Sequence, residues 1–262
     1  MSDPRNPFNY PINPKYGEGV FHRKIRLQNG QDETGMFVFA ELEDCNHGFC
    51  IKIYHNQQEV TAILPEAKRI PLTTCAGAAE PLKRLIGENI HQNSKSLNER
   101  LNPQANCTHW LDLSIWALAH ASRGDKHERV YHIQIPDEME GGTQAQLFVN
   151  NTLTLDWTIE NWTVKTPLIY AGQPFYKGFA AWANNIQDPI EREAAFVLQK
   201  GYFVSRARYF NIDQLAGEKA NEHTMMLGAC YSYSEPRVSV AQRTKGTVRD
   251  FTGQAEQLLK FV

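Results

Sequence analysis

The sequence predicts an α+β protein: an antiparallel β-sheet with helices packed on one side, plus a second β-rich half. Short segments alternate between apolar and polar residues and are separated by turn residues, which is typical of half-buried strands. One longer segment, residues 107–122, instead repeats its apolar residues with the period of a helix. With 262 residues, 42% of them hydrophobic, the chain is long enough to bury a large core in one or two domains.

The first part of the chain divides into an arm and a sheet. Residues 1–19 are expected to form an extended N-terminal arm, because their prolines interrupt regular structure. Residues 20–123 are expected to form a sheet-plus-helices half. Its strands are predicted at residues 20–27, 36–42, 49–54 and 60–64, the last three as an antiparallel meander.

Two helices follow this meander. One begins at Cys75, or else a turn at residues 75–79 precedes a helix with Pro81 in its first position, since proline inside a helix removes a hydrogen bond. Gly87 ends it in either case. The second helix is residues 107–122, where His109 and His120 bound an apolar stripe.

Residues 124–262 are expected to form a second α+β half that packs as one unit with the first. A glycine-rich and proline-rich loop is expected at residues 163–178, and Asp188-Pro189 is a helix-start signal. The other expected elements are strands at residues 130–135, 145–149, 153–157 and 225–233, and helices at residues 179–184, 189–202 and 254–261.

Composition and motifs exclude several function classes. The formal net charge of −2 provides no basic field for nucleic acid or anionic lipid. No apolar run approaches membrane-spanning length, and the N-terminus does not resemble a signal peptide. The five cysteines, an odd number, therefore indicate reduced thiols in the cytoplasm. Phosphate-binding glycine loops are missing, so no nucleotide cofactor is expected.

Cys75, Cys107 and His109 are the first candidate site. A cysteine at a helix start lies near unpaired backbone N–H groups, which stabilise its thiolate. Thiolate and imidazole groups together are suited to zinc or iron. The two cysteines are 32 residues apart (107 − 75), so only the fold could bring them together. The alternative is that both are small buried core residues and that the histidine caps a helix.

Two polar groups are further candidates. Asp44 and His47 lie at the corner between two predicted strands that lead towards Cys75. Either could supply a fourth ligand to the metal of the first candidate site, or a general base; the alternative is a polar hairpin tip. Arg206, Arg208 and Tyr209 could bind a carboxylated or aromatic small molecule, since arginine binds carboxylates through paired hydrogen bonds. The alternative for the arginines is ion pairing with the many acidic residues of the chain.

Several segments from about residue 20 onward resemble a bacterial family of proteins of unknown function. They are Arg69-x-Pro71-x-x-x-Cys75, Leu82-x-x-Leu85-x-Gly87, Cys107-Thr108-His109-x-x-Asp112-Leu113, Cys230-Tyr231, Ala241-x-Arg243 and Arg249-Asp250-Phe251. This resemblance implies no particular activity.

The run from Phe49 to Gly87, followed by Cys107, is also similar in order to the U-type iron–sulfur cluster scaffolds. That resemblance implies that Cys75 and Cys107 occupy cluster-ligand positions and that Asp44 lies near the first ligand region. The sequence departs from the scaffolds in lacking their Leu-Pro-Pro-Val-Lys segment.

Together these features favour a cytosolic bacterial enzyme of lyase, isomerase or hydrolase type. Its substrate would be a small carboxylated or aromatic catabolic intermediate, and zinc or iron would assist the reaction. The alternative is a metal or iron–sulfur carrier without turnover. Neither a nucleic acid nor a membrane is expected as a partner, and a homo-oligomer remains open.

Overall fold

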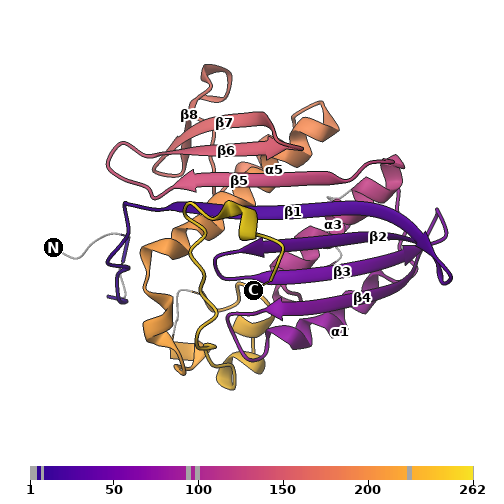
Figure 1. Ribbon diagram of the computed structural model, residues 1–262, viewed down its shortest axis with the longest axis horizontal. Coiled ribbons are helices and arrows are strands. Elements are labelled where there is room, and N and C mark those ends of the chain that lie inside the picture. Colours follow the sequence, from indigo (N-terminus) through magenta and orange to yellow (C-terminus); the bar gives the residue numbers. More distant parts are fainter. Residues whose placement is uncertain (1–4, 7–8, 93–95, 98–100, 223–225, 262) are drawn as a thin grey trace. The chain divides into compact units, whose positions relative to one another are not determined.

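The computed structural model describes residues 5–6, 9–92, 96–97, 101–222 and 226–261 (Figure 1). Its contacts divide the chain into two compact units. Unit 1 comprises residues 1–23, 131–215 and 250–256, and unit 2 comprises residues 24–130, 216–249 and 257–262. Each unit therefore collects segments that are distant along the chain.

Unit 2 holds the predicted meander. Strands β2 (Gly35–Asp44), β3 (Gly48–His55) and β4 (Val60–Arg69) pair antiparallel. Strand β1 (Val20–Asp32, of which the first four residues belong to unit 1) is the neighbour of β2 in the strand order. Almost every residue of β3 is buried, which shows that both of its faces are covered. The predicted strands are confirmed, and two of them extend further than expected: β1 continues to Asp32 and β4 to Arg69.

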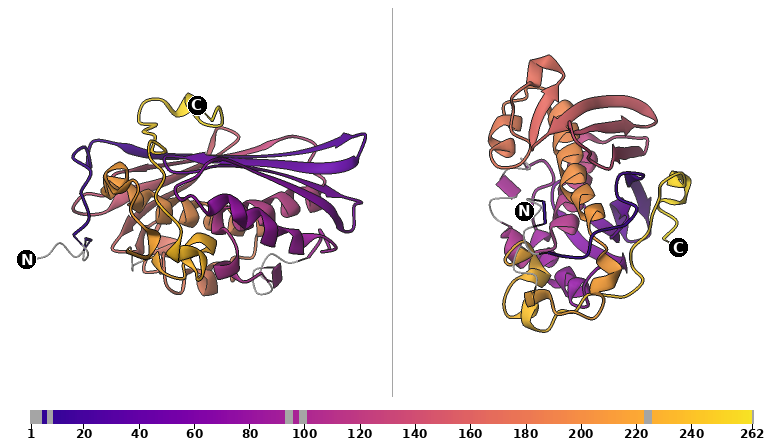
Figure 2. Two further views of the ribbon diagram at one scale, coloured as in Figure 1. Left: turned by 90° about the horizontal axis from the view of Figure 1, so that it is seen from below. Right: turned by 90° about the vertical axis from the view of Figure 1, so that its left-hand side faces the viewer.

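The helix at the centre of unit 2 is α3 (Thr108–Arg123). It begins after Cys107 and ends at Gly124, whose φ of 66° is left-handed, as the sequence predicts. The helix packs against β2 and β3, and Trp110 donates a hydrogen bond from its indole nitrogen to the Cys50 carbonyl, at 3.1 Å. Figure 2 (left) shows α3 on one face of these strands and the last residues of the chain on the other.

The segment that begins at Cys75 is a broken helix. A 3-10 turn, η1 (Cys75–Ala78), leads into the short α1 (Ala79–Leu82) and a second 3-10 turn, η2 (Lys83–Leu85). Pro81 is tolerated within α1 because the first N–H groups of a helix have no partner inside it. The structure is closer to the second of the two predicted alternatives, a turn followed by a helix. The helix begins at Ala79, two residues before Pro81, instead of at the proline itself.

Unit 1 is the second β-rich region. Strands β5 (Arg129–Pro136, of which the first two residues belong to unit 2), β6 (Thr143–Val149), β7 (Thr152–Glu160) and β8 (Thr163–Thr166) pair antiparallel in that order. Helix α5 (Pro189–Ser205) packs on β6 and β7, and the short α4 (Phe179–Ala183) packs on α5. Asp188 accepts from the N–H groups of Ile190 and Glu191, the predicted helix-start signal.

The predicted α+β class is therefore confirmed, with antiparallel strands and packed helices. Three local expectations were wrong. The expected loop at 163–178 opens with strand β8. Within the expected strand at 225–233, the described residues from 226 onward form turns and a 3-10 segment, because the Gly228 N–H donates to the Tyr233 carbonyl of the same segment and the Tyr231 N–H donates to the Asn106 carbonyl. Met225 lies outside the described residues.

The expected C-terminal helix is also absent. Residues 255–257 form only a 3-10 turn, and Leu259 and Phe261 have left-handed φ angles of 70° and 55°. Their N–H groups donate to the Glu43 carboxylate, at 2.6 and 3.3 Å, instead of to helical carbonyls. No helix in the described part of the chain is long and apolar enough to cross a bilayer.

Candidate metal and acid–base site

The tip of the β2–β3 hairpin is organised by Asp44. Its carboxylate accepts hydrogen bonds from the backbone N–H groups of Asn46 and His47, at 2.8 and 2.9 Å. The Asp44 N–H in turn donates to the His47 carbonyl, at 2.9 Å. Aspartate favours such turns because its short side chain bonds to the backbone two or three residues later. The acidic corner predicted from the sequence is thus a rigid turn.

Asp44 also fixes the imidazole of His47. The Nδ1 atom of His47 lies 3.0 Å from one carboxylate oxygen of Asp44 and 3.3 Å from the other. The Asp44 side chain is fully buried, and that of His47 is 12% exposed. When Nδ1 carries the proton and donates to Asp44, Nε2 is left as the basic nitrogen, which is the arrangement of a general base oriented by a carboxylate.

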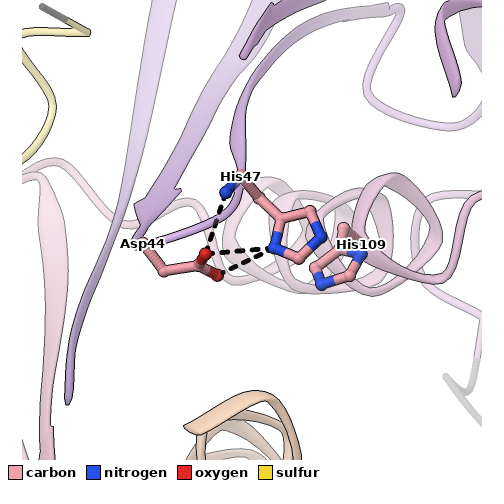
Figure 3. Close-up of side chains that lie close together, drawn as sticks. All are labelled: Asp44, His47 and His109. Atoms are coloured by element: carbon pink, nitrogen blue, oxygen red, sulfur yellow. Dashed lines mark hydrogen bonds and ion pairs between the residues drawn. The ribbon is translucent and has the colours of Figure 1, made fainter. Parts of the chain in front are cut away.

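The first turn of α3 brings His109 to the same place. The ring centroids of His47 and His109 are 3.8 Å apart and their planes 27° from parallel. Phe49 lies beside both rings, with centroid distances of 6.0 and 5.9 Å. Figure 3 shows the two imidazoles stacked beside the Asp44 carboxylate.

These three side chains can hold a metal ion. One ligand atom from each of Asp44, His47 and His109 lies within 4.8 Å of the others, and among the described residues they form the one such group of three. Two imidazoles and one carboxylate suit zinc in a catalytic site and non-haem iron(II). Three protein ligands leave coordination positions for water or a substrate.

The structure does not place Cys75 and Cys107 in this group. Cys75 belongs to an apolar cluster with Leu72, Tyr233 and Val238, and the Ser232 hydroxyl donates to its sulfur, at 3.4 Å. Burial raises the pKa of the Cys75 thiol to about 11 and that of Cys107 further. Backbone N–H groups at the start of α3 act to lower the pKa of Cys107, but burial outweighs them.

The predicted substrate-binding residues are engaged within unit 1. Arg208 is buried and bonds to Asp137 through two nitrogens, at 2.8 and 3.3 Å, and also to Asp250, at 3.1 Å. Arg206 pairs with Glu138. These contacts are the ion pairs that the sequence left open as the alternative.

Tyr209 packs its buried ring edge-on against Tyr16, with centroids 4.9 Å apart. A polar cavity of about 10 Å³ lies beside Arg206 and Tyr16. That volume holds about one water molecule, so this cavity is too small for the expected substrate.

Sequence reasoning missed two residues that contact the hairpin tip. Arg69 donates to the carbonyls of Asp44, Cys45 and His47, and it pairs with Glu43 at 2.9 Å. The Arg69-x-Pro71 segment was noticed only for its resemblance to a family. The alternation of side chains along a strand could have drawn attention to Glu43. Because Glu43 directly precedes Asp44, its side chain projects from the opposite face of β2.

Comparison with protein families gives a match over the first part of the chain. Residues 22–122 match the family described as "Protein of unknown function (DUF2889)". This confirms the resemblance to a family of unknown function, and the matched residues include Asp44, His47 and His109. The similar segments at Cys230 and Arg249 lie outside the match. No curated protein matches the chain.

Proposed function

We propose that this chain is a metal-assisted enzyme in which Asp44, His47 and His109 hold a divalent zinc or iron ion. The observation that carries the proposal is the meeting of these side chains, from a hairpin tip and a helix start, with ligand atoms within 4.8 Å of one another. Such an ion polarises a substrate oxygen or lowers the pKa of a bound water. The reaction is of lyase, isomerase or hydrolase type on a small carboxylated or aromatic substrate.

The composition of the group favours a catalytic role over a structural one. Structural zinc sites are closed by four cysteine or histidine ligands, whereas catalytic sites use three protein ligands and keep a position open. The group contains a carboxylate and no sulfur. Phe49 is buried beside both imidazoles, so it helps to hold the two rings in place.

The carrier alternative has less support from the same residues. Iron–sulfur clusters are held by thiolates. Burial raises the pKa of Cys75 to about 11, so its sulfur is protonated at neutral pH. Cys107 is also buried, and its pKa is raised in the same direction.

A chelation experiment tests the proposal. Tag-free protein is assayed on a panel of small carboxylated and aromatic esters, hydrates and hydroxy acids, before and after dialysis against a chelator. The proposal expects activity that chelation abolishes and that Zn²⁺ or Fe²⁺ restores in the wild type but not in His47→Ala. Activity that survives chelation and is lost in His47→Ala would instead identify a metal-free Asp44–His47 base.

A further inference from the structure

The site hairpin is held from the face of the sheet opposite to His109. Adjacent residues of a strand project to opposite faces, so Asp44 faces α3 while Glu43 faces away from it. The final residues of the chain lie on that second face (Figure 2, left). There the fully buried Glu43 carboxylate accepts from the N–H groups of Leu259 and Phe261, at 2.6 and 3.3 Å.

Arg69 connects this carboxylate to the loop that carries the site. One terminal nitrogen of Arg69 donates to Glu43 and to the Asp44 carbonyl, at 2.9 and 2.6 Å, and lies 3.4 Å from the His47 carbonyl. The other donates to the carbonyls of Cys45 and Thr247, at 3.0 and 2.8 Å. A single planar guanidinium thus bonds to three carbonyls of the turn between Asp44 and His47, which a lysine could not reproduce.

The C-terminal segment fits closely against the same hairpin. Leu259 and Phe261 adopt left-handed backbone conformations, which non-glycine residues seldom occupy unless the surroundings impose them. Gly48 lies directly under the Phe261 ring: a Cβ added to Gly48 would lie 3.0 Å from Phe261 Cδ1. In these conformations both N–H groups donate to the same carboxylate oxygen of Glu43.

We infer that Glu43 and Arg69 are positioning residues for Asp44 and His47. Together with Leu259–Phe261, which bond to Glu43, they form what we call the clamp of the hairpin turn. The inference rests on the proposed function, since it assigns the clamp to the proposed metal ligands. A buried ion pair contributes little net stability compared with apolar packing, so its value here is in fixing one geometry of the turn.

The test compares Glu43→Gln with the matched control Glu41→Gln. Glu41 lies on the same strand and face, is also buried, and pairs with Arg26 instead of with the hairpin turn. Cobalt(II) is the probe, because its visible absorption reports ligand geometry. Hydrogen exchange at the Asn46 and His47 amides, measured without metal, reports the Asp44 turn directly, since both amides donate to that carboxylate.

Glu43→Gln is expected to weaken cobalt binding by about 10- to 100-fold, as removal of groups that orient metal ligands does elsewhere. It is also expected to speed exchange at both amides, whereas Glu41→Gln changes neither. Should Glu43→Gln fail to fold, Arg69→Lys serves instead, because it keeps the charge but loses the planar fork.

The outcomes separate the inference from the proposed function. A wild type that binds no cobalt refutes the metal site, and the clamp is then judged by amide exchange alone. Exchange that is as slow in Glu43→Gln and Arg69→Lys as in Glu41→Gln overturns the clamp. If the wild type binds cobalt and the clamp variants bind it with the same affinity, the clamp is overturned as well.

Discussion

The imidazole of His47 lies face to face with that of His109, with ring centroids 3.8 Å apart. One ring belongs to a hairpin turn and the other to the first turn of α3, 62 residues later (109 − 47). The stacking places two nitrogen ligands next to the Asp44 carboxylate, which already bonds to His47 Nδ1 at 3.0 Å. The proposed activity depends on this contact between hairpin and helix.

Replacing His109 with alanine should weaken zinc binding strongly and leave the fold intact. The loss should exceed the roughly 10- to 100-fold that removal of a ligand's hydrogen-bond partner costs, because a ligand itself is removed. Titration calorimetry with Zn²⁺ measures the change. His91→Ala is the control, since His91 is exposed and bonds to Ser122 and Gln57. Equal affinities in the two variants would remove His109 from the site.

Cys75 should react slowly with iodoacetamide in the native protein. The thiolate is the reactive form, and burial raises the Cys75 pKa to about 11. Modification at pH 8 should therefore be far slower than in urea, and it should rise as pH approaches 11 while the protein stays folded. Peptide mass spectrometry over time measures both rates. Rapid native modification at pH 8 would show instead a stabilised thiolate, as the helix-start argument expects.

Removing the Arg208 side chain should destabilise the protein by about 3–5 kcal/mol, because Asp137 would be left as a buried unpaired carboxylate. Urea unfolding of Arg208→Met gives the free energy. Lys165→Met is the control: its ion pair with Glu160 is exposed, and such pairs contribute at most about 1 kcal/mol. Near-equal stabilities of the two variants would favour a substrate-binding role for Arg208 over a structural one.

The stability of the wild type relative to Glu41→Gln should fall as pH rises from 4.5 towards 7. Burial raises the pKa of Glu41 above its ordinary value of 4.5, although the charge of Arg26 acts to lower it. The folded state therefore binds more protons than the unfolded state just above pH 4.5, and stability decreases with rising pH there. Urea midpoints at several pH values measure this. If the wild type instead became more stable relative to Glu41→Gln as the pH rises, the predicted direction of the pKa shift would be contradicted.

Local sequence signals predicted the elements whose hydrogen bonds are local. The alternation from 49 to 54 identified β3, and Gly124 marked the end of α3. The same signals failed at the C-terminus, where residues 254–261 have a helical pattern. There Glu43, more than 200 residues earlier, accepts the N–H groups that a helix would use.

The members of the candidate site were each visible in the sequence, and Asp44 or His47 was expected beside His109, but together with Cys75 and Cys107, which the group in the structure does not include. Asp44 and His47 were identified as a polar corner, and His109 as part of a helix start. Which of them meet depends on where α3 crosses the hairpin, and sequence spacing carries no such information. The cysteine at the start of α3 shows why local reasoning failed there. The backbone N–H groups near Cys107 lower the pKa of its thiol as expected, but burial raises that pKa by more.

The most direct test of the metal site is elemental analysis of wild-type protein purified without a tag and without added metal, beside Cys107→Ala and His109→Ala. The account predicts about one zinc or iron per chain in the wild type and in Cys107→Ala, and none in His109→Ala. A wild type without stoichiometric metal, or a metal that is lost with Cys107 and kept without His109, would contradict it.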